Sequence, residues 1–128
     1  MFQTLTPNLM VEDVNATIKF YQDLLDFQVI ASVPDEGELD FAIVTSGNIT
    51  LLLQKRTSLV AEIPFFKDKP LGGSLTLYIQ TTGIDELYQR ISHQVTIVQD
   101  LHTTFYGTKE FAIEDCNQFI LAFAEKIN

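Results

Sequence analysis

The fold of this chain is decided by the stretch YGTKEFAIEDCNQFILAFAEK, residues 106–126. Apolar and polar residues alternate on both sides of a polar turn, which is typical of a hairpin with one face on a core. A shorter version lies seventy residues earlier, since Phe41-Ala42-Ile43 matches Phe111-Ala112-Ile113 and residues 48–54 parallel residues 118–124. We infer that the chain contains an internal duplication.

The composition is that of one globular domain spanning residues 1–128. Apolar residues make up 46% of the chain and charged residues 20%, which is enough to bury a core. The single cysteine, Cys116, excludes an internal disulfide framework and a Cys-rich zinc site, and it fits a reducing compartment. The sequence shows neither a signal peptide nor an uncharged run of roughly 20 residues, so we expect a cytoplasmic protein without a membrane partner.

The net charge is strongly negative. Seventeen acidic and eight basic residues give a formal charge of −9, which repels phosphate backbones and argues against a nucleic-acid partner. Such a charge keeps a protein soluble, and it also attracts cationic ligands. The charge alone does not choose between these roles.

The first half of the chain is predicted to form a strand, a helix and three further strands. Residues 5–11 alternate between apolar and polar, and Asp13 supplies an N-cap for a helix that runs to about Leu25. The three following strands are predicted at residues 27–33, 39–45 and 49–55. The segment from Arg56 to Gly73 then breaks every periodicity.

This irregular segment has several interpretations. Pro64, Pro70 and the pair Gly72-Gly73 surround Phe65-Phe66, which favours a lid, a crossover between two halves or an interface arm over a packed element. It is equally well a plain linker whose two phenylalanines pack onto the core. A docking arm would make the protein an interaction module.

The second half repeats the first. Residues 75–79 predict a strand, Thr82 with Asp85 resembles a capping box, and the apolar spacing predicts a helix to Ile91. A short strand at residues 95–98 precedes the closing hairpin. We therefore predict an α+β fold of two tandem βαβββ modules, residues 1–56 and 73–128, joined by a connection at 57–72, with the helices on one side of the combined sheet.

This arrangement resembles the vicinal oxygen chelate superfamily, which includes glyoxalases, bleomycin resistance proteins, fosfomycin-modifying enzymes and extradiol dioxygenases. The resemblance rests on Val11-Glu12-Asp13, Phe20-Tyr21 and Leu25-Asp26-Phe27 near the start, and on residues 106–115 near the end. It implies a mixed sheet that curls around a cleft, with the helices outside. The family usually places His and Glu metal ligands in that cleft, one from each of four strands.

The positions that correspond to these ligands are occupied by Thr6, Leu52, Ser74 and Ala122. A catalytic metal site needs about three imidazole or carboxylate donors, which these residues do not provide. We therefore predict neither a metal nor a cofactor, and no catalytic residue.

Four other side chains carry groups that bind metals or take part in catalysis. His93 and His102 are predicted to lie on the surface, after the second helix and in a turn. Glu110 is predicted to form an ion pair or hydrogen bond at the hairpin, beside Lys109, in preference to acting as a general base. Cys116 has no nearby basic partner and is predicted to be inert.

The resemblance together with strand alternation predicts the residues that line the cleft. They are Thr6, Asn8, Met10, Thr50, Leu52, Gln54, Ser74, Thr76, Tyr78, Tyr106, Ile120, Ala122 and Ala124. Their side chains suit an amphipathic organic molecule held by shape and a few hydrogen bonds. Alternatively the cleft is filled, or it is a dimer interface. The opposite face, which includes Leu5, Leu9, Leu75 and Leu121, is far more apolar and is predicted to pack against the helices.

Two functional hypotheses follow. The first is a metal-free small-molecule binding protein of the bleomycin-resistance kind, which forms a homodimer, is not an enzyme, and sequesters an antibiotic or toxic metabolite of cationic or planar aromatic character. The second is a lyase, isomerase or dioxygenase of the same superfamily with an unusual metal site or none.

Overall fold

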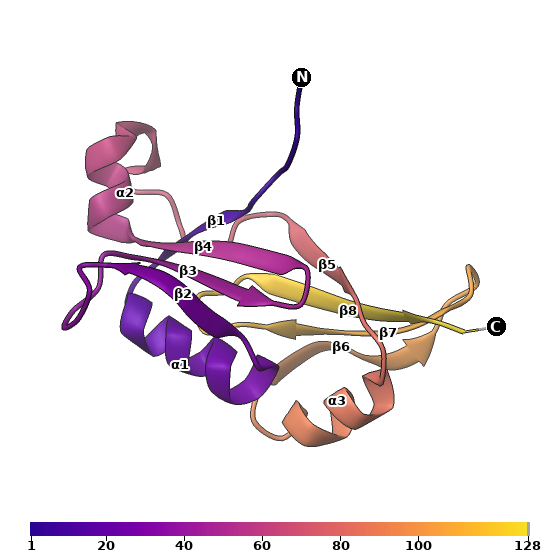
Figure 1. The fold of residues 1–128 in the computed structure, drawn as a ribbon. Helices are drawn as coiled ribbons and strands as arrows, with labels where there is room; N and C mark the ends of the chain where they lie inside the picture. The colour runs from indigo at the N-terminus through magenta and orange to yellow at the C-terminus, as the bar shows by residue number, and fades with distance from the viewer. Residues whose placement is uncertain (128) are drawn as a thin grey trace. The chain divides into compact units, whose positions relative to one another are not determined.

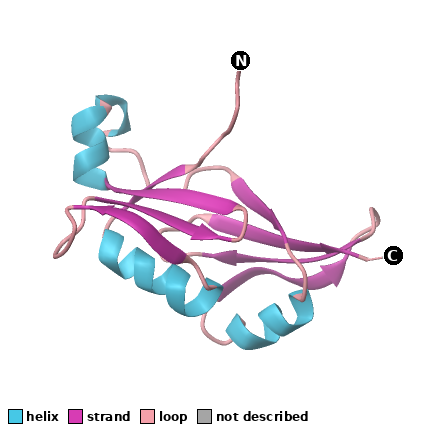
Figure 2. Cartoon of the chain, in the orientation of Figure 1, coloured by secondary structure: helices cyan, strands magenta, loops and turns pink. Residues whose placement is uncertain are grey.

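The computed structural model describes residues 1–127 and divides into two compact units, Met1–Leu71 and a second that begins at Gly72. Together the described residues form eight strands, three α-helices and one short 3₁₀ turn (Figures 1 and 2). Each unit contains a four-stranded mixed sheet that does not close on itself. The α+β class and the tandem pair of modules predicted from the sequence are thus confirmed.

The first unit begins with the βαβββ order and ends with a further helix. Its elements are β1 (Asn8–Val11), α1 (Val14–Leu25), β2 (Gln28–Val33), β3 (Phe41–Ser46), β4 (Ile49–Lys55), α2 (Arg56–Glu62) and the 3₁₀ turn η1 (Pro64–Phe66). The strand order is β1-β4-β3-β2. Strand β1 runs parallel to β4, and the other neighbours are antiparallel.

Helix α1 covers the apolar face of this sheet. Alternation turns Leu9, Val11, Leu51 and Leu53 to one side, where all four are buried. Tyr21 on α1 is fully buried and meets Phe27 edge to face, with the ring centroids 5.3 Å apart. Each such side chain contributes about 1.5–3 kcal/mol on burial, which explains why an amphipathic helix settles on this face.

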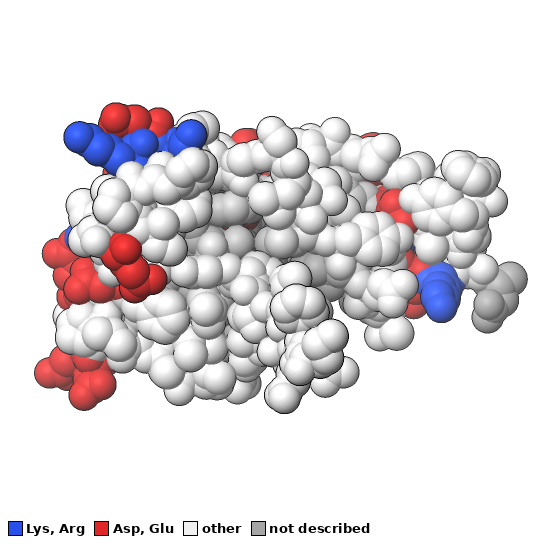
Figure 3. All heavy atoms as spheres, turned by 90° about the horizontal axis from the view of Figure 1, so that it is seen from above, with Lys and Arg blue, Asp and Glu red and all other residues white. Residues whose placement is uncertain are grey.

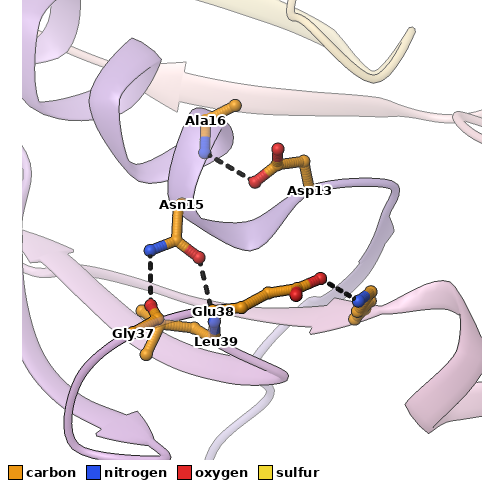
Figure 4. Close-up of polar contacts among 7 residues, drawn as sticks. Asp13, Asn15, Ala16, Gly37, Glu38 and Leu39 are labelled. Carbon is orange, nitrogen blue, oxygen red and sulfur yellow. Dashed lines mark hydrogen bonds and ion pairs between the residues drawn. The ribbon is translucent and has the colours of Figure 1, made fainter.

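The start of α1 is fixed by two polar side chains (Figure 4). The Asp13 carboxylate accepts a hydrogen bond from the Ala16 N–H at 3.0 Å and so caps the helix, as predicted. The Asn15 amide donates to the Gly37 carbonyl and accepts from the Leu39 N–H, both at 2.9 Å. The acidic turn before β3 is therefore tied to the helix.

The second unit repeats the βαβββ order. Its elements are β5 (Thr76–Gln80), α3 (Ile84–Ile91), β6 (Thr96–Thr103), β7 (Thr108–Glu114) and β8 (Ile120–Lys126). The strand order β5-β8-β7-β6 has the same pattern of parallel and antiparallel neighbours. Helix α3 packs against the face that carries Phe111 and Phe123, since Tyr88 meets Phe111 edge to face at 5.2 Å between centroids.

The β7–β8 turn explains why residues 106–126 form a hairpin. One oxygen of Asp115 accepts hydrogen bonds from the N–H groups of Asn117 and Phe119, at 2.8 and 2.9 Å. Gly72 packs against this turn, and a β-carbon there would lie 2.3 Å from the Gln118 carbonyl oxygen. The position therefore requires glycine.

The cap of α3 differs from the prediction. The sequence suggested a capping box of Thr82 and Asp85, but the N-cap is Gly83 in a left-handed conformation. The two free N–H groups at Gly83 and Ile84 instead donate to the Glu125 carboxylate, each at 3.0 Å. A carboxylate from β8, remote in sequence, thus accepts the hydrogen bonds of the N–H groups at the start of the helix.

Three other predictions about elements were wrong. The first strand begins at Asn8, so Leu5 is 88% exposed, and the fifth begins at Thr76, which leaves Leu75 half exposed. Strand β6 is eight residues long and includes two irregularities in its pairing with β7, which mask the alternation on which the shorter prediction rested.

The connection after β4 also proved partly regular. Helix α2 buries Leu59 and so packs as an element, contrary to the prediction. A helix of seven residues with one buried apolar side chain gives almost no periodic signal, which is why it was missed. Phe65 remains 70% exposed.

The strand registers refine the duplication. Asn8 pairs with Leu52 in the first sheet and Tyr78 pairs with Ala122 in the second, so both strands keep the seventy-residue offset. Asn8 therefore corresponds to Tyr78. The same offset aligns Thr6 with Thr76, so Thr6 and Ser74, which both precede their strands, do not correspond in the structure.

The helices of the described chain are short. The longest, α1, has twelve residues, and across residues 1–127 no helix combines the length and apolar character needed to cross a bilayer.

Candidate functional site

Glu110 lies at the centre of the polar face of the second sheet. It stands on β7 with His102 of β6 on one side and Ala124 of β8 on the other. Because side chains alternate along a strand, Glu110 points away from the face that α3 covers. Only 7% of its surface is exposed, which is unusual for a carboxylate.

Three hydroxyl groups converge on this carboxylate. The Tyr78 hydroxyl on β5 donates to Oε2 at 2.6 Å, and Thr108 Oγ1 on β7 donates to the same oxygen at 2.8 Å. The Tyr106 hydroxyl, in the β6–β7 turn, lies 3.1 Å from both Oε1 and Oε2. We call these four residues the Glu110 cluster. Neutral donors from three segments thus hold one buried charge.

The hydrogen bonds determine the ionisation of the cluster. Burial by itself would raise the pKa of Glu110, but the bonds from Tyr78, Thr108 and Tyr106, with the charge of His102 nearby, outweigh it and hold the pKa below its usual value. The bond to Glu110 raises the pKa of Tyr78 to about 12. Burial and then the bond to Glu110 raise the pKa of Tyr106. At neutral pH the cluster is a carboxylate bound by neutral phenols.

Glu110 does not pair with the neighbouring Lys109. Lys109 instead forms an ion pair with Asp85 of α3, with 2.7 Å between Nζ and Oδ1. Of the two alternatives predicted for Glu110, the hydrogen bond is therefore confirmed and the ion pair is wrong. Alternation is the reason, since adjacent residues on β7 face opposite sides of the sheet.

Two of the residues predicted to line a cleft meet at this cluster, namely Tyr78 and Tyr106. Ala122 lies between Tyr78 and Ala112 in the sheet register, and Thr76 pairs with Ile120. Ala122 carries only a methyl group beside Tyr78. Ser74 is exposed and precedes β5.

The predicted residues of the first unit form a different arrangement. The Asn8 amide donates to Gln54 Oε1 at 2.9 Å, and the Gln54 amide donates to Ser58 Oγ on α2 at 3.0 Å. We call these three residues the Gln54 chain. Met10 and Gln54 are buried, Thr50 and Leu52 are half-buried, and Thr6 is exposed before β1. That both sets line one cleft stays a prediction.

Three residues at this site, Thr108, Glu110 and His102, were not predicted from the sequence to lie in a binding site. His102 is not in a turn but on β6, half-buried, with its Nδ1 atom 2.7 Å from the Asp100 carbonyl oxygen. The available signal was the alternation of Thr108 and Glu110, which places both on one face of β7. What the sequence does not reveal is that Tyr78, thirty residues earlier, reaches the same carboxylate.

The residues of this chain do not fit a catalytic metal. The four positions at which the family resemblance implies ligands carry two hydroxyls, a leucine and an alanine. Among residues 1–127, no three or more His, Cys, Asp and Glu side chains gather in a group that could hold a metal ion. Glu110 is a single carboxylate whose Oε2 already accepts three hydrogen bonds.

The visible charge of the surface is unevenly distributed. Figure 3 shows acidic and basic side chains gathered at the margins of the face it presents, whereas most of that face belongs to uncharged residues. The whole chain carries a formal charge of −9.

Comparisons with known proteins identify the family of this chain. A family model described as the Glyoxalase/Bleomycin resistance protein/Dioxygenase superfamily matches residues 3–123. An uncharacterised protein of Mycobacterium bovis is 25% identical over 114 residues, which cover 87% of this chain and 75% of that protein.

Solved structures show the same fold. A protein of unknown function from Agrobacterium tumefaciens has a TM-score of 0.83 at 19% identity, with 99% of this chain and 96% of that chain covered. A glyoxalase/bleomycin resistance protein/dioxygenase from Nocardioides has a TM-score of 0.78 at 15% identity, covering 100% and 85% of the two chains. This is the class of proteins built from paired βαβββ units. The chain belongs to the glyoxalase/bleomycin resistance protein/dioxygenase superfamily.

Proposed function

We propose that this protein binds a small organic molecule on the polar face of the second sheet, without a metal ion. The observation that carries the proposal is the convergence of Tyr78, Tyr106 and Thr108 on the buried Glu110 carboxylate. Fixed hydrogen-bonding groups beside small apolar residues such as Ala122 are the usual composition of a ligand site. In this proposal the ligand is recognised by its shape and by hydrogen bonds.

Binding explains the cluster better than catalysis does. A general base is most effective when its pKa lies near the working pH, whereas the hydrogen bonds hold the pKa of Glu110 below the ordinary value of a glutamate. The same carboxylate is well suited to hold a fixed negative charge. The biological role in this proposal is sequestration of an antibiotic or toxic metabolite in the cytoplasm by a homodimer.

A binding screen tests the proposal. Purified protein is screened by thermal shift and calorimetry against neutral, cationic and anionic organic compounds, with and without added divalent ions. We expect a saturable ligand whose affinity does not depend on metal and which raises the melting temperature. The absence of any saturable ligand, or a stoichiometric metal required for binding, would overturn the proposal. Size measurement by light scattering, with and without ligand, tests the homodimer.

The second candidate is a metal-independent isomerase or lyase. Two phenols beside a carboxylate provide groups that can move protons, and both tyrosines are half exposed and within reach of a bound molecule. The two functions separate experimentally. Any ligand found in the screen is incubated with the protein and followed by mass spectrometry and NMR. Recovery of unchanged ligand supports binding, and its conversion supports an enzyme.

A further inference from the structure

The two oxygens of Glu110 are used unequally. Oε2 accepts the short bonds from Tyr78 and Thr108, at 2.6 and 2.8 Å, and shares the bond from Tyr106. Oε1 accepts only the longer, shared bond from Tyr106 at 3.1 Å. A carboxylate has about four acceptor sites. Oε2 therefore holds the side chain in place, while Oε1 keeps the capacity for another donor.

The buried charge lacks a fixed cationic partner. Within residues 1–127, no lysine or arginine side chain forms an ion pair with Glu110, and the nearby Lys109 pairs with Asp85 instead. Buried charges in proteins are normally paired or bound to an ion. His102 lies opposite Glu110 in the strand register, and its Nδ1 atom lies 2.7 Å from the Asp100 carbonyl oxygen.

An exposed aromatic pair adjoins the Glu110 cluster. Phe105 is 99% exposed and meets Tyr106 edge to face, with the centroids 5.1 Å apart. Tyr106 joins the two features, because its hydroxyl bonds to Glu110 while its ring contacts Phe105. Aromatic faces attract cations, including the ammonium groups of organic ligands.

We propose that the Glu110 cluster recognises an arylalkyl ammonium ion, with the ammonium group on Oε1 and the aromatic part against Phe105 and Tyr106. This inference rests on the proposed function and names its ligand class. A primary ammonium brings three donors, of which one binds Oε1 and another the Tyr106 oxygen. A hard metal cation fits less well, because it requires six or more oxygen ligands and one carboxylate oxygen is on offer.

Three matched probes separate charge from shape. Phenethylammonium carries the proposed group, phenethyl alcohol is its neutral analogue, and phenylpropionate is its anionic analogue. Calorimetry is expected to show saturable binding of phenethylammonium at least tenfold tighter than that of the alcohol, and none of the anion. Equal affinity for the three probes would contradict the inference.

Four variants test which residues bind the ammonium group and the aromatic ring. Glu110→Gln keeps the size and acceptor oxygen but removes the charge, so we expect at least a tenfold loss for phenethylammonium and no change for the alcohol. Glu114→Gln makes the same chemical change four residues along the same strand and is expected to bind like the parent protein. Tyr106→Phe keeps the ring but removes the hydroxyl oxygen that the second ammonium hydrogen binds, so binding should weaken, and by less than in Glu110→Gln. Phe105→Ala should weaken binding severalfold.

The outcomes also separate this inference from the proposed function. If the wider screen finds a neutral or anionic ligand that Glu110→Gln does not affect, the protein binds small molecules but the ammonium inference is wrong. If no compound of any class binds, both fail. Melting curves and NMR spectra of each variant establish that it is folded. A folded Glu110→Gln protein that binds phenethylammonium as tightly as the parent refutes the inference directly.

Discussion

The two units share a topology but place different groups on the same sheet face. In the first unit Asn8 donates to Gln54, a neutral amide that is 5% exposed. In the second the corresponding Tyr78 donates to Glu110, a carboxylate. A neutral chain fixes α2 to its sheet, while the charged cluster has a carboxylate oxygen, Oε1, that accepts only one long, shared hydrogen bond. Duplication preserved the backbone, and the chemistry diverged.

One pair of acidic residues makes the difference clear. The repeat that aligns Phe41 with Phe111 also aligns Asp40 with Glu110. Asp40 precedes β3 and is exposed, whereas Glu110 lies within β7 and is buried, because β7 begins three residues earlier relative to the repeat. The strand registers also separate them, because Phe41 lies opposite Gln54 whereas Glu110 lies opposite Ala124, so two carboxylates that the sequence repeat aligns have different positions in their sheets and different surroundings.

Removing each carboxylate is the strongest way to test this comparison. Glu110→Ala is expected to lower the free energy of unfolding by about 1.5–3 kcal/mol, since bonds to a buried charged group are lost. Asp40→Ala should change it by less than about 0.5 kcal/mol, as exposed sites usually do. Urea unfolding of both variants measures the difference. Equal effects would show that burial does not distinguish the two positions.

Acid should reduce the contribution of Glu110. Its pKa lies below the ordinary 4.5 in the folded protein, so its stabilisation is present above the unfolded pKa and is lost as the pH falls through the folded pKa. The stability of the parent protein should therefore approach that of Glu110→Gln on acidification. Urea unfolding of both proteins across acidic pH checks this. A difference in unfolding free energy that widens toward low pH would mean that folding raises the pKa of Glu110.

Tyr78 should titrate unusually late. The bond to Glu110 raises its pKa from 10.0 to about 12, so this bond stabilises the fold fully below pH 10 and loses its effect as the pH rises toward 12. In Glu110→Gln the pKa should fall back toward 10.0. Ultraviolet titration of tyrosinate, with Tyr78→Phe to assign the signal, measures the shift. An unchanged late titration in Glu110→Gln would mean that another group causes it.

The neutral chain of the first unit should matter less. Asn8→Ala removes the donor to Gln54 and is expected to cost about 1 kcal/mol, the usual net contribution of a neutral hydrogen bond. Unlike the changes at Glu110, this loss should not depend on pH, because neither amide titrates. Urea unfolding of Asn8→Ala at neutral and acidic pH compares the two units. A loss of unfolding free energy that depends on pH would mean that Asn8 interacts with a charged group.

The smallest effect is expected at a helix cap. Glu125→Gln weakens the interaction of β8 with the Gly83 and Ile84 N–H groups and should cost about 0.3–1 kcal/mol, as a charge at a helix N-terminus typically contributes. Helix α1, capped by the adjacent Asp13, is unaffected. Hydrogen exchange at α3 and α1 gives the comparison, and faster exchange in both helices would point to a global loss of stability.

Local patterns in the sequence predicted much of the fold. Alternation in residues 106–126 and its repeat gave the hairpins, and Asp13 gave the start of α1, because each depends on neighbours within a few residues. The predicted ends of the strands were less accurate. The exposed Leu5 and Leu75 show that an apolar pattern continues beyond the last residue with a hydrogen-bonding partner.

The sequence by itself determined the class of fold, the duplication and the lack of a suitable ligand set at Thr6, Leu52, Ser74 and Ala122. Tertiary structure decided which polar groups meet. Tyr78 and Glu110 are thirty-two residues apart and Glu125 lies forty-one residues from Ile84, so only strand pairing and register bring them together. A local pattern tells which face a side chain takes, but the partner across the sheet depends on long-range pairing.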